Sequence, residues 1–303
     1  MEYVLIFLAV LCFSGQFAFT KIYEGTVKQT TASSLIMLTV TGLVGALLFL
    51  IIGGFKISLS PVTVMWAAVF ALIMIPYYTV GIKVLSLGSL AIYSMFMMLG
   101  GMLVPFFYGI ILLGEEISIG KLIGTVLLTL FIILQAVSQR DAETSSCKGS
   151  GKRRGMFFAL CLLIFFINGM TGVVAKAHQI SVGAADEISF TVISCTLTAV
   201  FGGAILSVLA ARQKQPVIEA ARGVMHVKPI LVMTLIGAAA HSGNLLHLTA
   251  AASLPASVQV PIVSGGVIVL SALISVAVFK EKVTGKEWIC IAGAFFSTVL
   301  FAF

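Results

Sequence analysis

The sequence predicts an all-α integral membrane protein with ten transmembrane helices in two inverted five-helix repeats. Composition predicts the membrane: of the 303 residues, 60% are hydrophobic and 10% charged, whereas soluble domains carry about 25% charged residues. A shared layout predicts the repeats, because the stretch from Gly81 to Lys121 resembles the stretch from His247 to Glu287. Such a chain has lipid as its main solvent.

Ten apolar runs lie between polar or Gly/Pro breaks, and each has about the 20 residues that a helix needs to cross the hydrocarbon core. They lie near residues 3–20, 33–52, 62–82, 89–113, 120–138, 155–175, 187–210, 229–250, 257–279 and 286–303. The first run lacks a basic segment before it and is as long as the later ones, so we interpret it as a retained helix and not a cleaved signal. Cysteines within these runs, such as Cys195, are interpreted as small apolar side chains.

The longest polar break divides the chain into two halves. Residues 139–154 (QRDAETSSCKGSGKRR) have the Ser-, Gly- and charge-rich composition of a linker. The break follows the fifth run, so residues 1–138 form a first repeat and residues 155–303 a second. Because five is an odd number, matching halves enter the membrane from opposite sides, and the duplication is inverted.

The repeated layout is clearest around the fourth and ninth runs. At a constant offset Gly100 meets Gly266, Glu115 meets Glu281, and Ser118 meets Thr284. Each copy has an apolar run with small residues at its middle, a Glu at its end, a Ser or Thr three residues later, and another apolar run. Internal duplication is the recurring construction of secondary transporters, so the layout favours transport.

The basic residues predict an orientation. After the odd-numbered runs lie 15 of the 18 lysines and arginines, and only Lys56, Lys121 and Lys176 lie on the other face. Because the richer face is normally cytoplasmic, we expect both termini outside a plasma (inner) membrane that the chain crosses many times. The net charge of +7 then reflects topology and anionic lipid, and no aromatic-interleaved basic patch indicates nucleic acid.

The two repeats resemble the EamA-type members of the drug/metabolite transporter superfamily over nearly the whole chain. The residues that carry this resemblance are GEEISIGKLIG at 114–124, KEKVTGKEWICIAG at 280–293, FSGQFAFTK at 13–21 and NGMTGVVAK at 168–176. Pro255 and Pro261 fit the small or Pro residues at the entry to the ninth helix of that family. The resemblance implies a secondary transporter of metabolites. Many relatives hold both termini inside, whereas the charge bias here argues the reverse.

The repeated Glu and Ser/Thr positions are interpreted as structural helix-end motifs. Ser118 and Thr284 are placed to cap the following helix, and Thr284 forms a plausible capping box with Glu287. Glu115 and Glu281 lie near the positive end of that helix, where a carboxylate is favoured. The alternative makes these two acids gating or coupling groups.

No carboxylate lies in the middle of a run. Every Asp and Glu falls at the end of a run or in a loop: Glu2, Glu24, Glu115, Glu116, Asp141, Glu143, Asp186, Glu187, Glu219, Glu281 and Glu287. The small multidrug resistance proteins, distant relatives of the EamA type, exchange protons for cationic drugs on a buried Glu. That mechanism needs an intramembrane acid, so strong cation/proton antiport is disfavoured.

Uncharged polar residues near the middles of the runs predict a central cavity between the repeats. On a helix, His241, Asn244 and His247 fall within about a 120° arc that rises about 9 Å, and unpartnered polar groups in hydrocarbon are costly. The full set of candidate cavity residues is Gln16, Tyr78, Tyr93, Ser94, Asn168, Thr171, His241, Asn244, His247 and Gln259. Each of these side chains could instead form a hydrogen bond that joins two helices. If transport is coupled to protons, His241 is the expected titrating group. The spacing of the two histidines does not indicate a metal site.

Transport by alternating access is the expected function, with a small neutral, zwitterionic or amine-like metabolite as substrate. No GxxxxGK[ST] motif is present, so a primary pump is excluded, and no cofactor is expected. The alternatives are a membrane-embedded lipid-modifying enzyme, for which acid/base or nucleophilic clusters are too sparse, and a non-transporting scaffold. We expect no enzymatic activity, and a monomer or homodimer whose partners are the bilayer and the substrate.

Overall fold

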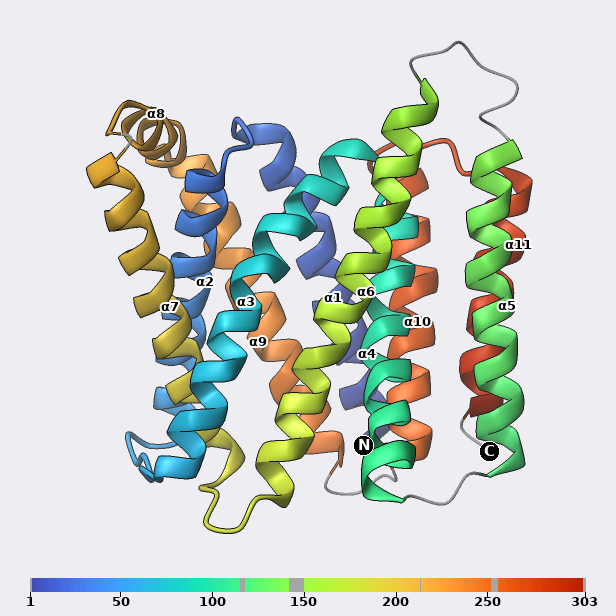
Figure 1. The fold of residues 1–303 in the computed structure, drawn as a ribbon, viewed down its shortest axis with the longest axis horizontal. Coiled ribbons are helices and arrows are strands. Elements are labelled where there is room, and N and C mark those ends of the chain that lie inside the picture. The colour runs from blue at the N-terminus through green and yellow to red at the C-terminus, as the bar shows by residue number, and fades with distance from the viewer. Residues whose placement is uncertain (1, 115–117, 142–149, 213, 252–255, 302–303) are drawn as a thin grey trace. The chain divides into compact units, whose positions relative to one another are not determined.

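The computed structural model describes residues 2–114, 118–141, 150–212, 214–251 and 256–301. Within those ranges the chain forms eleven α-helices and no strand (Figure 1), so the prediction of an all-helical chain is confirmed there. The contacts divide it into two compact units, here called unit 1 (Met1–Ala18, Leu87–Gly169 and Ser242–Phe303) and unit 2 (Phe19–Ser86 and Met170–His241). Each unit is described by itself.

Ten of the helices follow the ten expected runs closely. The helices are α1 (Glu2–Thr26), α2 (Thr31–Ile52), α3 (Pro61–Leu87), α4 (Leu90–Leu113), α5 (Ile119–Asp141), α6 (Ser150–Ile180), α7 (Glu187–Arg212), α8 (Lys214–Val224), α9 (Val227–Ala251), α10 (Ala256–Ala277) and α11 (Gly285–Phe301). Both α5 and α6 extend into the segment expected as a linker, because its polar ends continue the helical hydrogen bonding beyond the apolar runs.

Seven of the helices are long and apolar enough to cross a membrane: α1, α2, α3, α4, α6, α7 and α9. Two further apolar stretches, Ile119–Phe131 and Ile262–Ala277, are shorter. Many large apolar side chains of these helices, such as Leu47 and Ile51 of α2, are exposed on the surface. Such a surface is typical of helices whose solvent is lipid. These features are those of an α-helical, multi-pass membrane protein.

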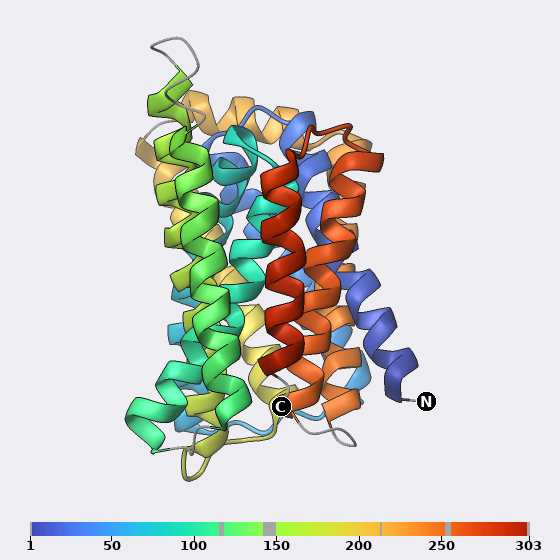
Figure 2. The same ribbon diagram turned by 90° about the vertical axis from the view of Figure 1, so that its right-hand side faces the viewer.

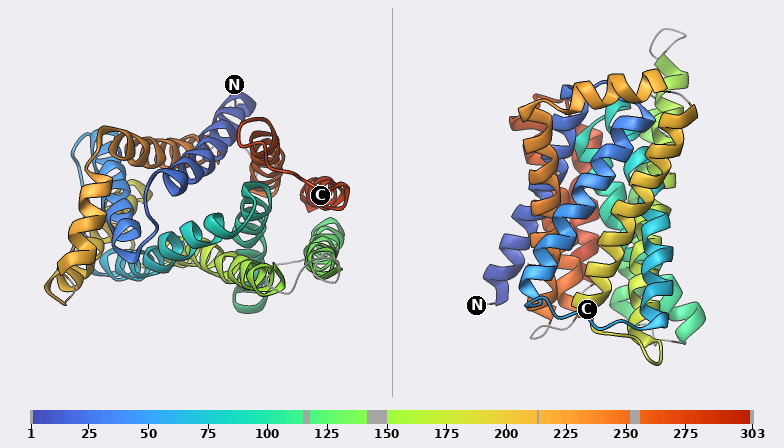
Figure 3. Two further views of the ribbon diagram at one scale, coloured as in Figure 1. Left: turned by 90° about the horizontal axis from the view of Figure 1, so that it is seen from above. Right: turned by 90° about the vertical axis from the view of Figure 1, so that its left-hand side faces the viewer.

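Helix α8 in unit 2 was not expected, because residues 211–228 were interpreted as a loop. Val217, Ala220 and Val224 are buried on one stripe of this helix, while Glu219 and Arg222 are exposed. The buried stripe packs on residues of α2 and α7, including Ala32 and Leu206, and α8 runs across the ends of both helices (Figure 3). Amphipathic spacing of this kind gives a surface helix and not a membrane span.

Within unit 2, α2 and α7 pack closely along each other in antiparallel directions. A Cβ on Gly42 would lie 2.9 Å from the Cys195 carbonyl oxygen, and a Cβ on Gly202 would lie 2.7 Å from Thr39 Oγ1. The residue numbers therefore rise along one helix as they fall along the other. Missing side chains at these two positions let the backbones approach, as small residues do in membrane helix pairs.

Within unit 1, α5 lies beside α11 (Figure 2) and α4 beside α10. A Cβ on Gly293 of α11 would lie 2.1 Å from the Phe131 ring of α5. The start of α4, at Ser89, approaches Ser275 near the end of α10, with 3.5 Å between the two hydroxyl oxygens. Helices α4 and α10 are therefore antiparallel as well.

The repeated Glu at residue 281 caps α4, whereas the sequence placed it at the positive end of α11. Its Oε2 accepts hydrogen bonds from the Leu90 N–H (2.9 Å), the Ser89 hydroxyl (3.1 Å) and the Ser275 hydroxyl. The chain after α10 folds back so that the carboxylate meets the free N–H groups at the start of α4. Glu115 lies outside the described residues.

The other helix-end motifs have the expected caps. The Thr284 and Glu287 side chains each bond to the other residue's backbone N–H, which makes the capping box at the start of α11. Ser118 Oγ accepts from the Lys121 N–H at the start of α5, at 3.2 Å. Both Ser118 and Thr284 therefore satisfy backbone donors.

Candidate functional site

The candidate cavity residues are divided between the two units. Tyr78, Thr171 and His241 belong to unit 2. Those that belong to unit 1 are Gln16, Tyr93, Ser94, Asn168, Asn244 and His247. The Gln259 side chain lies outside the described part of the chain. Because α9 has residues in both units, the expected stripe of His241, Asn244 and His247 is divided as well.

In unit 2 the imidazole of His241 is held among residues of two other helices, α2 and α7. Its ring meets the edge of Phe49 from α2, with centroids 6.1 Å apart and planes at 85°. Cys195 Sγ from α7 lies 3.9 Å from Nε2 and 4.0 Å from Nδ1. The ring occupies the space that a side chain at Gly45 would need, since a Cβ there would lie 2.2 Å from Nε2.

Thr41 joins His241 to Tyr78. The Thr41 backbone lies close enough to His241, and the Thr41 hydroxyl close enough to Tyr78 of α3, for each pair to interact. The same hydroxyl donates within α2, to the Met37 carbonyl at 2.8 Å and the Leu38 carbonyl at 3.1 Å. Tyr78, one of the candidate cavity residues, is therefore linked to His241 through one residue.

This group, here called the His241 site, combines residues from the first and second halves of the chain. Thr41, Gly45, Phe49 and Tyr78 come from residues 1–138, while Cys195 and His241 come from residues 155–303. It offers an imidazole, a phenol and a hydroxyl among apolar walls, with no carboxylate among the contacts that the structure describes for His241. Such a set suits hydrogen bonds to an uncharged polar or zwitterionic solute.

In the same site Cys195 and His241 do not form a nucleophilic pair. The sulfur lies almost equally far from both ring nitrogens, so it lies along the lone-pair direction of neither. A thiol activated by an imidazole needs that alignment at a shorter distance. Among the described residues, no three His, Cys, Asp or Glu side chains gather as a metal would require.

The candidate residues of unit 1 have structural partners. Asn168 of α6 donates its side-chain N–H to the Met97 carbonyl of α4 at 2.6 Å, which is the hydrogen bond between helices left open as an alternative. The buried Tyr93 ring meets the edge of Phe17, with centroids 5.7 Å apart. Ser94 donates to the Ala91 carbonyl within α4.

The remaining candidates differ in exposure. Asn244 is exposed and His247 half-buried in unit 1, while Gln16 is buried there. Thr171 is half-buried in unit 2. The prediction that His241, Asn244 and His247 share one polar surface stays a prediction, because His241 lies in unit 2 and the other two lie in unit 1.

Sequence reasoning missed Thr41, Gly45, Phe49 and Cys195. Thr41 lies in the middle of an apolar run, as the chosen residues do, and that position is the signal that could have found it. Cys195 was interpreted as a small apolar side chain, and nothing in one sequence pairs it with His241. A side chain's neighbours on other helices follow from tertiary packing, which periodicity does not encode.

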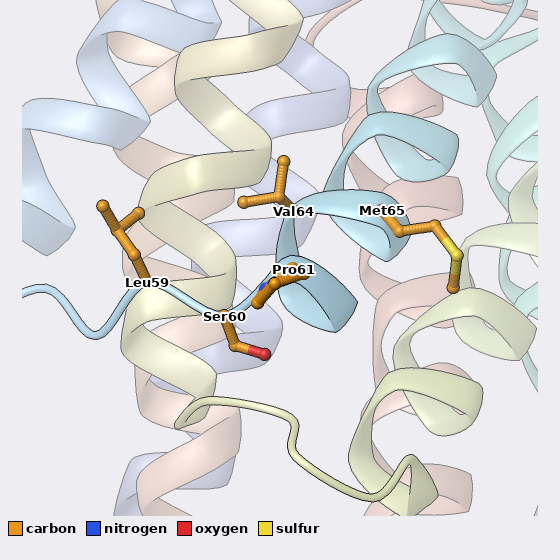
Figure 4. A pocket seen from close by; sticks show the side chains of 5 residues that line it. All are labelled: Leu59, Ser60, Pro61, Val64 and Met65. Atoms are coloured by element: carbon orange, nitrogen blue, oxygen red, sulfur yellow. The ribbon is translucent and has the colours of Figure 1, made fainter.

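An apolar surface pocket in unit 2 is separate from the His241 site. It is lined by Leu59, Ser60, Pro61, Val64 and Met65 at the start of α3 (Figure 4). All five residues come from one short segment, four of them apolar, and the pocket is open to its surroundings. It lacks the convergent polar groups of a solute site.

Comparison with known proteins gives the fold. No family model matches the chain, and no curated protein matches it. A solved crystal structure, described only as that of a protein, is similar with a TM-score of 0.50 and 16% sequence identity. The match covers 99% of this chain and 96% of that chain. At that identity the likeness shows a shared fold alone.

Proposed function

We propose that this chain is a secondary transporter that moves a small neutral, zwitterionic or amine-like metabolite by alternating access. Ten of its helices would form two inverted repeats, residues 1–138 and 155–303, as in the EamA-type transporters that the sequence resembles. The antiparallel packing of α2 on α7 and of α4 on α10 carries the proposal. In the proposed repeats these pairs would be equivalent helices, and inverted repeats place equivalent helices antiparallel.

Matching caps on α2 and α7 support the same proposal. Thr30 caps α2 and accepts from the N–H of Ser33, and Asp186 caps α7 and accepts from the N–H of Ser189 at 2.9 Å. The Ser33 hydroxyl accepts from the Thr30 N–H, and the Ser189 hydroxyl donates to the Asp186 carboxylate. The proposed repeats would therefore each begin their second helix with a side-chain cap and a Ser three residues later.

The His241 site supports a solute path between the repeats. Polar groups inside apolar helices cost free energy unless they have partners or water, and this site joins polar groups from both repeats. In the proposed cycle these groups bind the solute, and relative movement of the repeats exposes it to one side and then the other. A lipid-modifying enzyme is the weaker alternative, because the site lacks an aligned nucleophile and base.

The orientation remains the one that the basic residues predict, with both termini outside. Lys28, Arg222 and Lys228 all adjoin the cluster of Val27, Val224 and Val232, so they lie at one end of unit 2. That end would be cytoplasmic, facing anionic lipid.

A thermal-shift screen of the purified protein against small metabolites tests whether the chain binds a solute. A ligand that binds only the folded state stabilises it by about 2.7 kcal/mol at a concentration 100 times its Kd. We expect neutral, zwitterionic or amine-like solutes to raise the melting temperature. Failure of the whole library to do so, with lipids tested alongside, would count against a solute site.

We expect His241→Gln to preserve solute binding and to abolish any dependence of uptake on a pH gradient. Glutamine keeps hydrogen-bonding groups at this position but cannot take up a proton near neutral pH. The measurement is uptake of the identified solute into proteoliposomes with and without an inward proton gradient. Unchanged stimulation by the gradient in the variant would exclude His241 as the coupling group.

A further inference from the structure

At one end of unit 2, two segments from different repeats are held together by a series of hydrogen bonds. The segments are residues 58–66, which lead into α3, and residues 178–189, which lead from α6 into α7. The Ser58 N–H donates to Ser189 Oγ (3.0 Å), and the Trp66 Nε1–H donates to Ser181 Oγ (2.9 Å). The Ser60 hydroxyl donates to the Gly183 carbonyl. We call this set the α3–α7 contact.

His178 lies in the middle of the α3–α7 contact and is only 1% exposed. Its Nε2 is 3.1 Å from Thr63 Oγ1, and its ring stacks on Phe190 with centroids 4.2 Å apart and planes at 18°. Thr63 Oγ1 already accepts the Ala185 N–H at 2.8 Å. The Thr63 hydroxyl proton is therefore available to Nε2, which completes the contact when the imidazole is neutral.

We propose that His178 is a proton-binding site of this transporter, and that protonation of its ring by solvent opens the α3–α7 contact. The proposal rests on the proposed function for its role in the transport cycle, and on the hydrogen bonds of unit 2 for its chemistry. It is separate from any titration of His241, which lies on a different helix.

Protonation breaks the contact because it places a second donor where an acceptor is needed. An added proton on Nε2 would face an oxygen that already accepts one N–H, and the Thr63 hydroxyl would lose the atom to which it donates. The ring would also carry a charge while buried, and Nδ1 has no hydrogen-bond partner among the described residues. A buried, poorly paired charge is costly, so the protonated ring favours hydration.

The acidic groups around His178 favour protonation of its ring. Asp186 and Glu187 lie at the start of α7, Lys176 lies on α6, Lys56 lies in the segment before α3, and the first turns of α3 carry no ionisable side chain. Burial raises the pKa of Asp186, but hydrogen bonds from Ser189 lower it by more, and the net direction is downward. Asp186 is therefore a carboxylate wherever histidine titrates, and Glu187 and Asp186 both attract the imidazolium.

Tryptophan fluorescence tests the proposal without any substrate. The chain has two tryptophans, so in Trp288→Phe the signal comes from Trp66, whose Nε1–H lies within the contact. We expect acrylamide quenching of Trp66 to rise roughly twofold between about pH 8 and about pH 5, the range that spans histidine titration. The same titration in His178→Gln should be flat, while His226→Gln, at an exposed histidine of unit 2, should keep the full response.

A second variant tests the same contact in case His178→Gln does not fold. Thr63→Val removes the hydroxyl that holds the ring, so quenching should already be high at pH 8 and change little with acid. A pH response that persists in His178→Gln, or its absence in the parent protein, overturns the proposal. If the response depends on His178 but the protein moves no solute, the proton site is supported. Only the proposed transport function is then contradicted.

Discussion

Gly100→Ala is expected to lower the melting temperature of the purified protein by a few °C. A Cβ at this position of α4 would lie 2.1 Å from the carbonyl oxygen of Phe165 and 2.8 Å from its Cα, both backbone atoms of α6. The two helices of unit 1 must then separate, because a backbone cannot rotate away as a side chain can. Overpacking of this kind costs typically 1–3 kcal/mol and sometimes more. It outweighs the gain of about 1 kcal/mol that alanine has over glycine inside a helix.

Gly203→Ala is the matched control for that prediction. Gly203 lies inside α7, and a Cβ there would meet no atom within 4 Å. Only the helix propensity changes, so this variant should be neutral or more stable by up to about 1 kcal/mol. Equal melting temperatures for Gly100→Ala and Gly203→Ala in the same detergent would show that α4 and α6 do not approach as described.

Gly45→Ala is expected to weaken solute binding at least about tenfold while costing less stability than Gly100→Ala. A Cβ on Gly45 would lie 2.2 Å from Nε2 and 2.5 Å from Cε1 of His241. These atoms belong to a side chain, so the ring can swing away without moving a helix. It then leaves Thr41 and Cys195, and a loss of about 1.4 kcal/mol in binding already corresponds to a factor of ten.

Binding and unfolding of Gly45→Ala should therefore be measured on one preparation. The midpoint of the thermal-shift titration gives the affinity for the solute, and the melting temperature without solute gives the stability. Gly203→Ala should keep the parent affinity. If Gly45→Ala also keeps it, the His241 ring is not part of the solute site.

The helices were predictable because each needs only local information. An apolar run between polar breaks defines a membrane helix whatever its neighbours are, and α2 and α4 end within two residues of the expected positions. Helix α8 was missed because its apolar stripe, Val217, Ala220 and Val224, is too sparse for a membrane run. Its helix is stabilised by packing on α2 and α7, which the sequence does not display.

The candidate site was predictable only in part. The cost of polar groups in lipid marks His241 and Tyr78 from the sequence alone, and the structure connects them through Thr41. The same rule also selected Asn168, whose amide instead bonds to the Met97 carbonyl and joins two helices. The free-energy cost of a polar group in lipid does not distinguish a solute site from a hydrogen bond between helices, since both give the group a partner.

Glu281 illustrates the same limit at a helix end. Its position after an apolar run predicts a carboxylate near a helix N-terminus, and the structure has one there. The helix is α4 and not the following α11, because the partner is chosen by how α10 folds back on α4 in unit 1. Spacing predicts the need for a cap but not which distant helix receives it.

Solute counterflow in proteoliposomes tests the proposed transport function most directly. Vesicles preloaded with the unlabelled form of a solute that the thermal-shift screen identifies are diluted into its labelled form, with no ATP present. A secondary transporter that alternates access should accumulate label transiently above equilibrium, and Gly45→Ala should reduce that accumulation about tenfold or more. A solute that stabilises the purified protein but shows no accumulation beyond empty liposomes would contradict transport and leave only a solute-binding membrane protein.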